Sequence, residues 1–488
     1  MSNFDFHAVA PELVLTGTIL LVAVVDAFLP RDRRWLAMPI SFVGVMGALG
    51  AALTLIGAHR SMFGGTYVVD PFAVLFKVFF LSTAAIVLGL SYRYMRDGRY
   101  FQGEYYFLLL AAFLGCVTMP SSRDLLMLFI SLELVSAPGF LIAAFRKTDP
   151  RSNEAGLKFF LIGVLSSAVM LYGMSLIYGV TGTTHLAAIA HRLGALTGGQ
   201  ETLSLAAILF VVAGFGFKVS AVPFQFWAPD TYEGAPVPVA AFLSVASKAA
   251  GMAGLLQLMF VAFAPAADFW TPLFAALSIA TMTIGNLVAL QQRQVVRLLA
   301  YSSIAQAGYM LLPFALVGAT HAIDARAFQA VELYILIYGV MNLGAFAVVI
   351  AMAREAPRLL LDDFAGLIRR APVVAVAMTV VLISLAGIPP TAGFFAKLYI
   401  FAVAVDEHGR GIGPWLAGIM VVNSVISVGY YISIVRQMIL VEGEQRPFRS
   451  PALVTGVAVL SAVAVVGLFI YVQSLAGVVP GATLVGTP

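Results

Sequence analysis

The sequence is poor in cysteine and in charged residues. It contains one cysteine, Cys116, among 488 residues, and only 11% of the residues are charged. A single thiolate cannot hold an iron–sulfur cluster or a structural zinc ion, and a lone cysteine cannot form a disulfide within the chain. We therefore expect no disulfide, no metal site and no bound cofactor in this chain.

Signatures of nucleotide and nucleic-acid binding are also missing. The segment from Gly214 to Phe217 is rich in glycine, but it lies inside an apolar run, where small residues usually allow close helix packing. The net charge is +4, yet the basic residues do not gather into a stripe with interleaved aromatic residues. We expect no nucleotide site and no nucleic-acid partner.

Histidine is absent from the long apolar runs. The six histidines lie in the amino-terminal segment or in the short polar segments between runs, at positions 7, 59, 185, 191, 321 and 408. No two of them have metal-ligand spacing on one helix face, so loop polarity explains them. A proton path through the interior would therefore have to use lysine, glutamate, tyrosine and water.

Long hydrophobic runs dominate what is present. Hydrophobic residues make up 61% of the chain, and the mean hydropathy is +0.97. This composition predicts an all-α polytopic membrane protein that lies in a lipid bilayer. Runs of about 18 to 25 residues predict about fourteen membrane helices. They begin near Leu13, Leu36, Phe72, Tyr105, Leu125, Gly156, Leu203, Val237, Pro272, Leu298, Phe328, Val373, Trp415 and Ala452.

The basic residues alternate between the predicted loops. Loops after odd-numbered helices hold eighteen, and loops after even-numbered helices hold five: Arg60, Arg123, Arg192, Arg326 and Arg410. Since positive loops stay in the cytoplasm, both termini should lie outside, on the periplasmic face of a bacterial inner membrane. The first run is followed by Arg31-Asp32-Arg33-Arg34, which predicts a retained first helix with its start outside and not a cleaved signal peptide.

A few charged residues lie inside the apolar runs. A charge at the middle of a membrane helix costs about 2.5 to 3.5 kcal/mol on insertion scales, so such residues usually serve ion or proton movement. Burial lowers the pKa of a lysine and a nearby carboxylate raises it again, so moving an acid can load or empty a buried lysine. Arginine releases no proton and dominates the loops. The candidates for proton transfer are Glu133, Lys158, Lys218, Lys248 and Lys397.

For each of these five candidates the simpler explanation is a structural ion pair without a role in proton transfer.

Three other charged residues within or near the apolar runs need no role in proton transfer. For Lys77, only a short way into its helix from Asp70, we expect the amine to snorkel to the outer surface. Asp26 and Glu332 lie near predicted helix ends, where we expect solvent to reach them. These three are therefore left out of the candidate set.

Prolines interrupt two of the lysine-bearing helices. Pro223 follows Lys218, and Pro389 and Pro390 precede Lys397. Proline removes a backbone donor and clashes with the preceding turn, so we expect helices seven and twelve to break close to their lysines. Broken helices at membrane depth must be buried in protein or line a wet cavity. Two such breaks in oppositely oriented helices indicate inverted repeats with a site at each break.

Three long motifs carry a family resemblance. Residues 215–224 read FGFKVSAVPF and residues 227–236 read WAPDTYEGAP, residues 297–309 read RLLAYSSIAQAGY, and residues 384–394 read SLAGIPPTAGF. In this order they resemble the antiporter-like membrane subunits of respiratory complex I, the proton-pumping NADH:quinone oxidoreductase. The opening Pro11-Glu12-Leu13, the fourteen-helix length and a lysine in the twelfth helix resemble subunit N, the relative of mitochondrial subunit 2.

The resemblance implies a fold of two inverted five-helix units. Helices one to three would occupy residues 1–104, the first unit 105–265, the inverted second unit 266–445, and helix fourteen and the carboxyl end 446–488. It further implies that Glu133 pairs with Lys218, with Lys158 near that pair, that Lys248 connects the two units and that Lys397 marks the outlet half.

The resemblance also implies partners and cofactors. Other membrane subunits of complex I would bind this chain, and FMN, iron–sulfur clusters and quinone would bind other subunits. Relatives commonly carry histidine where this chain has Gln225 and Gln306, and glutamine does not titrate near neutral pH.

Two other functions remain open from the sequence. A subunit of an Mrp-type Na⁺/H⁺ antiporter or of a membrane-bound hydrogenase would share the fold. A scaffold that anchors neighbouring subunits and moves no protons would share the composition.

Overall fold

The computed structural model describes residues 5–98, 100, 102–318, 321–406, 411–443, 448, 450–471, 477 and 479. Within these residues, thirteen helices are long and apolar enough to cross a membrane. Two shorter apolar helices, α16 (Pro372–Ala386) and α17 (Ala392–Val405), follow one another and make one interrupted crossing. The all-helical fold and the predicted number of about fourteen crossings are thus confirmed. Outside the described residues lie Arg99, Arg410, Arg446, Arg449 and His408.

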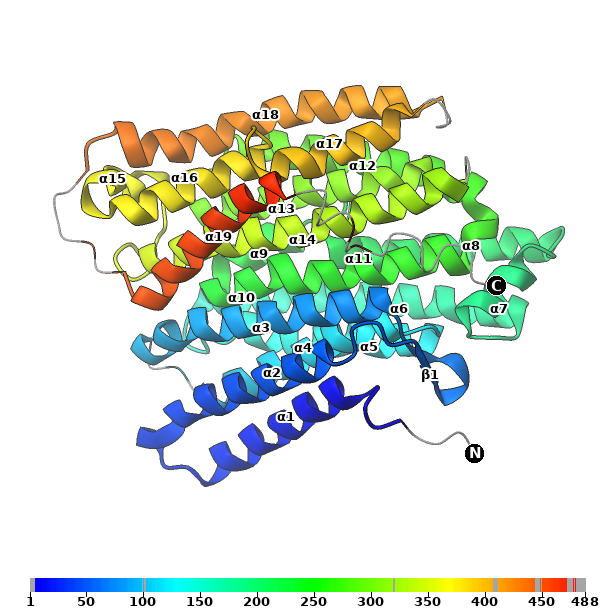
Figure 1. Ribbon diagram of the computed structural model, residues 1–488, viewed down its shortest axis with the longest axis horizontal. Helices are drawn as coiled ribbons and strands as arrows, with labels where there is room; N and C mark the ends of the chain where they lie inside the picture. The colour runs from blue at the N-terminus through cyan, green and yellow to red at the C-terminus, as the bar shows by residue number, and fades with distance from the viewer. Residues whose placement is uncertain are drawn as a thin grey trace.

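The helices lie side by side in one elongated bundle (Figure 1). The amino-terminal helices α1, α2 and α3 pack on α4 at one side of it, and α18 lies at the opposite side. The remaining bounds are α1 (Ala10–Phe28), α2 (Ala37–Leu53), α3 (Pro71–Asp97), α4 (Gln102–Thr118), α5 (Leu125–Ala143), α6 (Pro150–Thr181), α7 (Leu186–Leu193), α8 (Gly199–Val219), α9 (Trp227–Gly234), α10 (Val237–Phe242), α11 (Lys248–Gln257), α12 (Ala267–Ala289), α13 (Val295–Leu311), α14 (His321–Met352), α15 (Leu367–Arg370), α18 (Gly413–Leu440) and α19 (Ala452–Ile470).

The described strands form one short hairpin beside the start of α3. Strand β1 (Arg60–Met62) pairs antiparallel with β2 (Tyr67–Val69), with Met62 opposite Tyr67. Gly64 and Gly65 take left-handed backbone angles in the turn, which a residue with a Cβ rarely adopts. The hairpin packs against α3 and covers the side chain of Lys77.

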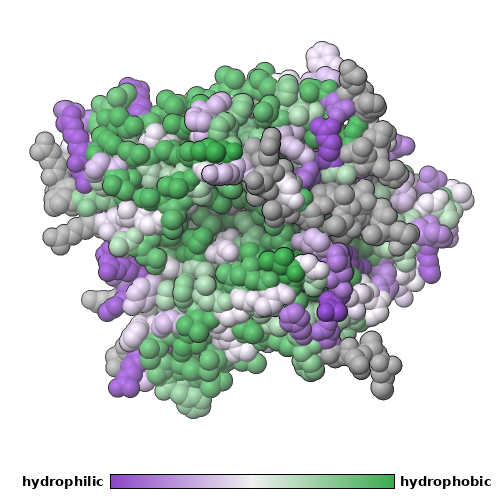
Figure 2. Space-filling model, in the orientation of Figure 1, coloured by the Kyte–Doolittle hydropathy of each residue, from purple (hydrophilic) through white to green (hydrophobic). Residues whose placement is uncertain are grey.

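The surface and the core of the bundle differ as a membrane protein requires. Large apolar side chains are exposed along α1, α6, α18 and α19, among them Leu20, Leu165, Val425 and Leu460. Figure 2 shows hydrophobic side chains over most of one face, with hydrophilic ones gathered towards its ends. Exposed apolar area on this scale marks contact with lipid or with other membrane subunits. Every residue from 237 to 260, a segment that carries Lys248, is buried within the bundle.

Candidate functional site

The first helix break follows Lys218 directly. Helix α8 ends at Val219, and Ser220 takes a left-handed conformation with φ of 61°. Ala221 N donates to Gly216 O at 2.8 Å and Trp227 Nε1 donates to Phe217 O at 3.0 Å, so these two carbonyl groups at the helix end are satisfied. The predicted break between Lys218 and Pro223 is confirmed, and protein groups cover its backbone as membrane depth requires.

The second break lies between α16 and α17. Gly387 ends α16 with φ of 81°, and Pro389 and Pro390 occupy the connection before α17 begins at Ala392. Gly387 N donates to Ile383 O at 3.1 Å, and Gly393 N donates to Ser384 Oγ at 3.1 Å. The predicted interruption before Lys397 is therefore confirmed as well.

Lys218 is buried and binds a serine. Its Nζ donates to Ser136 Oγ of α5 at 2.8 Å. Glu133 lies one helical turn before Ser136, and its Oε1 accepts a hydrogen bond from Ser167 of α6 at 2.5 Å. Among the ion pairs of the described residues, none joins Glu133 to Lys218, so the pairing that the resemblance implies stays a prediction. Ser136 and Glu133, three residues apart on α5, therefore bond to different helices, α8 and α6.

Lys248 lies where the helix geometry changes. A π-helical turn, Leu243–Ser247, separates α10 from α11, and Lys248 is the first residue of α11. Its Nζ donates to Ser303 O at 2.7 Å and to Ser303 Oγ at 2.5 Å, both on α13. π-Helical turns inside helices are frequent at functional sites. Lys248 on α11 therefore bonds directly to α13.

Lys397 binds the end of the broken helix in front of it. Its Nζ donates to Ala386 O, the last residue of α16, at 2.9 Å and lies 4.7 Å from the centroid of the Tyr309 ring. A cavity of about 320 Å³ lies beside it, with mainly apolar walls that include Phe394 and Val425. The amine thus bonds to a backbone carbonyl and a ring face, and not to a carboxylate.

Polar side chains occupy the core between Lys248 and Lys397. Gln306 of α13 is completely buried. Its Nε2 donates to Leu385 O at 3.0 Å and to Tyr431 Oη at 3.1 Å. Its Oε1 accepts a hydrogen bond from Tyr334 Oη at 2.5 Å. Leu385 and Ala386 are neighbours, so Gln306 and Lys397 bond to adjacent carbonyls of α16. Sequence reasoning missed both tyrosines, although buried tyrosines in apolar helices usually have a polar partner.

Lys158 lies elsewhere than predicted. Its side chain is 43% exposed, and Nζ contacts Asp230 Oδ2 and Glu154 Oε1, both at 2.7 Å. Arg297 of α13 contacts Asp230 Oδ1 at 2.6 Å and Glu233 Oε2 at 3.0 Å. Lys158 therefore belongs to an ion-pair cluster that joins α6, α9 and α13, and its predicted place beside Glu133 is wrong. Burial raises the pKa of Asp230, but the hydrogen bonds from the two cations outweigh burial and hold it below its ordinary value.

The expectations for Lys77 and Glu332 are wrong. Lys77 is completely buried, and its Nζ bonds to Glu12 of α1 and to Tyr67 Oη, the latter at 2.6 Å. The β1–β2 hairpin closes the way to the surface that snorkelling needs. Glu332 is completely buried within α14, away from either helix end. Asp26 lies near the end of α1, partly exposed, with Arg34 Nε at 3.6 Å.

Comparison with known proteins identifies the family. Residues 122–427 match the model of the NADH:quinone oxidoreductase/Mrp antiporter transmembrane family. NADH-quinone oxidoreductase subunit N of Trichlorobacter lovleyi is 40% identical over 444 residues, which are 91% of this chain and 89% of that protein. The chain belongs to the NADH-quinone oxidoreductase subunit N family.

Solved structures agree with this placement. A chain of respiratory complex I from Thermus thermophilus, solved with bound aureothin, is 31% identical and superposes with a TM-score of 0.80, over 96% of this chain and 98% of that one. A chain of the Mrp complex from Dietzia superposes at 0.84 over 99% of this chain and 98% of that one, but is only 20% identical, so it shows a common fold alone. Fold does not separate complex I from the antiporters, whereas sequence does.

The two glutamines at the positions where the resemblance implies histidine in relatives differ in environment. Gln306 forms the hydrogen bonds described above, whereas Gln225 lies in the first break and its buried Oε1 has no hydrogen-bond partner among the described residues. Gln306 can hold neighbouring hydroxyl groups in place but cannot gain or lose a proton near neutral pH. Proton transfer past it therefore needs hydroxyl groups or water.

Proposed function

We propose that this chain moves protons across the membrane as subunit N of NADH:quinone oxidoreductase, through Lys218, Lys248 and Lys397. The observation that carries the proposal is the environment of the three amines. Each is at most 7% exposed, and each donates to a hydroxyl or carbonyl oxygen and not to a carboxylate. A structural ion pair needs a carboxylate partner, so these contacts favour groups that exchange protons.

Glu133 is the acid of the proposed set. It lies one turn from the serine that binds Lys218, and it is only partly buried, between α5 and α6. A shift of its carboxylate towards Ser136 would place opposite charges close together without any movement of the helix break. We infer that such a shift controls whether Lys218 keeps its proton. Lys158 is not part of this set, because both of its partners are carboxylates and its side chain is nearly half exposed.

The arrangement of the chain supports two related units. We propose helices one to three at residues 1–104, a first unit at 105–265, an inverted second unit at 266–445, and a last helix at 446–488. Each proposed unit contains one broken helix and one buried lysine beside it. By the distribution of arginine, the end of the bundle that carries the α5–α6 and α14–α15 connections would face the cytoplasm.

The energy for proton movement would come from elsewhere in the complex. We propose that this chain binds no redox group, and that FMN, iron–sulfur clusters and quinone bind other subunits. Among the described residues, no group of three or more His, Cys, Asp or Glu side chains could hold a metal ion. Contacts with neighbouring membrane subunits would then couple quinone reduction to the charges in this chain.

Replacing Lys218 with arginine tests the proposal. Lys218→Arg keeps the positive charge but blocks release of the proton, because arginine stays protonated. The expected result is an assembled complex that has lost the proton movement of this subunit, measured as proton uptake by inside-out membrane vesicles on addition of NADH. Unchanged uptake with normal assembly would contradict the proposal and favour a scaffold. Arg297→Lys, in the ion-pair cluster, is the matched control that changes a cation outside the proposed path.

A further inference from the structure

The apolar cavity beside Lys397 opens on the membrane-facing surface between α17 and α18, which pack side by side at one edge of the bundle (Figure 1). Its volume is about 320 Å³, and the end of α16 forms another wall. Leu398, Val421 and Val425 line it and are between 44% and 68% exposed, so its mouth lies among side chains that face lipid. A molecule dissolved in the bilayer can therefore reach the cavity from the side.

Lys397 is the one charged residue among the described residues that line this cavity. Its aliphatic stem lies against Gly387, where a Cβ would come within 2.7 Å of Lys397 Cδ. A lysine amine carries three donors when it is protonated. Ala386 O accepts a hydrogen bond from one of them at 2.9 Å, and the Tyr309 ring faces the amine at 4.7 Å. The third donor is left for a molecule that occupies the cavity.

No acid within the described part of the chain balances this charge. None of the ion pairs there includes Lys397, and no Asp or Glu lines the cavity. A cation in an apolar membrane site without a carboxylate is costly, and an acid that binds beside it would lower that cost. The cavity thus combines apolar walls that suit a hydrocarbon chain with one cation that suits an acidic head group.

A second surface groove provides a comparison within the same protein. It lies between α16 and α19, its volume is about 720 Å³, and its walls are made by Val, Ala, Gly, Ile and Pro residues that include Val376 and Val463. Among the described residues, no charged side chain lines it. This α16–α19 groove suits any acyl chain, whereas the cavity beside Lys397 distinguishes an acid from a neutral lipid.

We propose that the cavity beside Lys397 binds a long-chain carboxylic acid from the bilayer, with its carboxyl group at the Lys397 amine and its chain directed past Val425 into the lipid. Ligand pockets measure about 300 to 1,000 Å³, so this cavity holds the head group and the first part of the chain. The inference goes beyond the proposed function, because binding needs only the charge and the shape of the cavity.

The depth of the site favours a carboxylic acid over a phospholipid head group. The amine bonds to Ala386, near the middle of the crossing that α16 and α17 make together. Phospholipid head groups stay in the polar layers on either side of the hydrocarbon core. A carboxylic acid can lose its charge by taking up a proton, and its neutral form enters hydrocarbon at a much lower cost.

Binding includes one proton transfer. The neutral acid gives its O–H proton to the Lys397 amine when that amine is neutral, which leaves a carboxylate and an ammonium group joined by a charge-assisted hydrogen bond. One O–H bond breaks, one N–H bond forms, and no other bond changes. A lysine paired in this way keeps its proton, so a bound acid blocks proton release from Lys397.

Photolabelling of the purified complex tests the site. The probe is palmitic acid with a diazirine on its chain, and the matched probe is the methyl ester of the same molecule, which has no acidic proton. Peptides from α16, α17, α18 and α19 are quantified by mass spectrometry. The acid should label α17 and α18 roughly tenfold more than the ester, because a hydrogen bond between charged groups contributes about that factor or more. The two probes should label the α16–α19 groove equally.

Three variants of the complex locate the label. Lys397→Met removes the charge and keeps the apolar stem, so labelling of α17 and α18 by the acid should fall to that by the ester. Val425→Trp fills the cavity, leaves Lys397 in place and should lose the label of both probes there. Val463→Trp is the matched control and should keep the label, because Val463 lines the α16–α19 groove and is 63% exposed, against 68% for Val425.

Two results would overturn the acid site. The first is equal labelling of α17 and α18 by acid and ester, which would show a neutral acyl chain in the cavity. The second is acid labelling that persists unchanged in an assembled Lys397→Met complex. If Lys397→Met does not assemble, the comparison of acid with ester in the wild-type and Val425→Trp complexes decides. The proposed function stands after each of these failures, since it does not depend on this ligand.

The crosslinked complex then tests the effect on proton movement. Unbound acid is removed with albumin, so that no free acid carries protons through the lipid, and the complex is reconstituted into vesicles. Proton uptake should fall in proportion to the labelled fraction of the wild-type complex and stay unchanged in Val425→Trp after the same treatment. Full uptake by a fully labelled complex would leave the site in place but overturn its inhibitory effect, and it would contradict the proposed proton transfer through Lys397.

Discussion

The two helix breaks have the same construction but hold their lysines differently. In both, a helix ends at a left-handed residue, Ser220 or Gly387, a few residues before proline. Lys218 lies before its break and bonds to a side-chain hydroxyl, one turn from Glu133. Lys397 lies after its break and bonds to the carbonyl at the end of α16, over an aromatic ring.

This difference indicates different means of control. The partners of Lys218 are side chains, which can change rotamer and bring a carboxylate nearer or farther. The partners of Lys397 are a backbone carbonyl and a packed ring, which have no such freedom, and a cavity of about 320 Å³ lies beside the amine. We infer that a moving charge controls the first lysine, whereas fixed groups hold the second in one environment.

The largest expected effect concerns how tightly each break is packed. A Cβ on Gly393 would lie 1.8 Å from the backbone oxygen of Ser384, whereas a Cβ on Gly216 would meet the edge of the Phe224 ring at 2.9 Å. Backbone cannot move aside as a side chain can, so Gly393→Ala should destabilise the subunit by about 1 to 3 kcal/mol or more, and Gly216→Ala by less. Subunit content and melting temperature of the purified complex measure this. Equal losses in the two variants would remove this contrast between the breaks.

An intermediate effect is expected from Glu133→Gln, which removes the charge with little change of volume. If this carboxylate controls Lys218 and not Lys397, its effect on proton uptake should be non-additive with that of Lys218→Arg. In the melting temperature of the purified complex, by contrast, the effects of Glu133→Gln and Lys397→Arg should add, because residues without shared partners act separately. The same non-additivity with both lysines would contradict separate control of the two breaks.

The smallest effect is expected from Ser220→Gly. Glycine relieves the left-handed strain of about 1 to 2 kcal/mol per residue, but it loses about 0.5 to 1 kcal/mol of chain entropy on folding. The melting temperature of the purified complex should therefore stay the same or rise slightly. A clear fall would show that the Ser220 side chain, whose Oγ has no hydrogen-bond partner among the described residues, stabilises the first break in another way.

The ion-pair cluster and the buried pair at Lys77 show where prediction from the sequence failed. Lys158 lies in an apolar run, yet its amine forms an ion pair with Asp230, 72 positions later, at the charged end of the bundle. Lys77 meets Glu12, 65 positions earlier, and the hairpin covers both. Hydropathy reports how far a residue lies along its own helix and says nothing about which distant segment packs over it.

Properties that depend on neighbours in the chain could be predicted from the sequence. The number of crossings follows from run length, because each crossing must span the same hydrocarbon thickness. The two breaks follow from proline and glycine, which act on their own helix turn through steric clash and a missing N–H. The isolation of Lys218, Lys248 and Lys397 within apolar segments was visible for the same reason.

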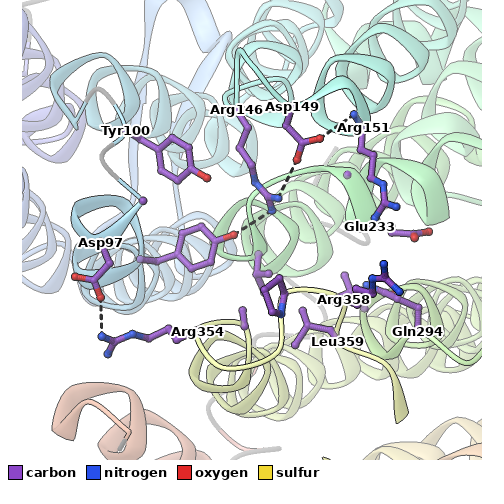
Figure 3. A pocket seen from close by; sticks show the side chains of 17 residues that line it. Asp97, Tyr100, Arg146, Asp149, Arg151, Glu233, Gln294, Arg354, Arg358 and Leu359 are labelled. Atoms are coloured by element: carbon purple, nitrogen blue, oxygen red, sulfur yellow. Dashed lines mark hydrogen bonds and ion pairs between the residues drawn. The ribbon is translucent and has the colours of Figure 1, made fainter. Parts of the chain in front are cut away.

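The tertiary structure decided which groups these lysines meet. Ser136 lies 82 positions from Lys218, and Ser303 lies 55 positions from Lys248, so neither contact has a local signal. Whether a carboxylate pairs directly with an amine or stands one turn away depends on how α5, α6 and α8 pack, and packing is set by the side chains of the whole bundle. The charged cavity of about 450 Å³ at the arginine-rich end of the bundle (Figure 3) likewise exists only because the ends of α3, α13 and α14, the α5–α6 connection and the α9–α10 turn, which are far apart in the sequence, converge there.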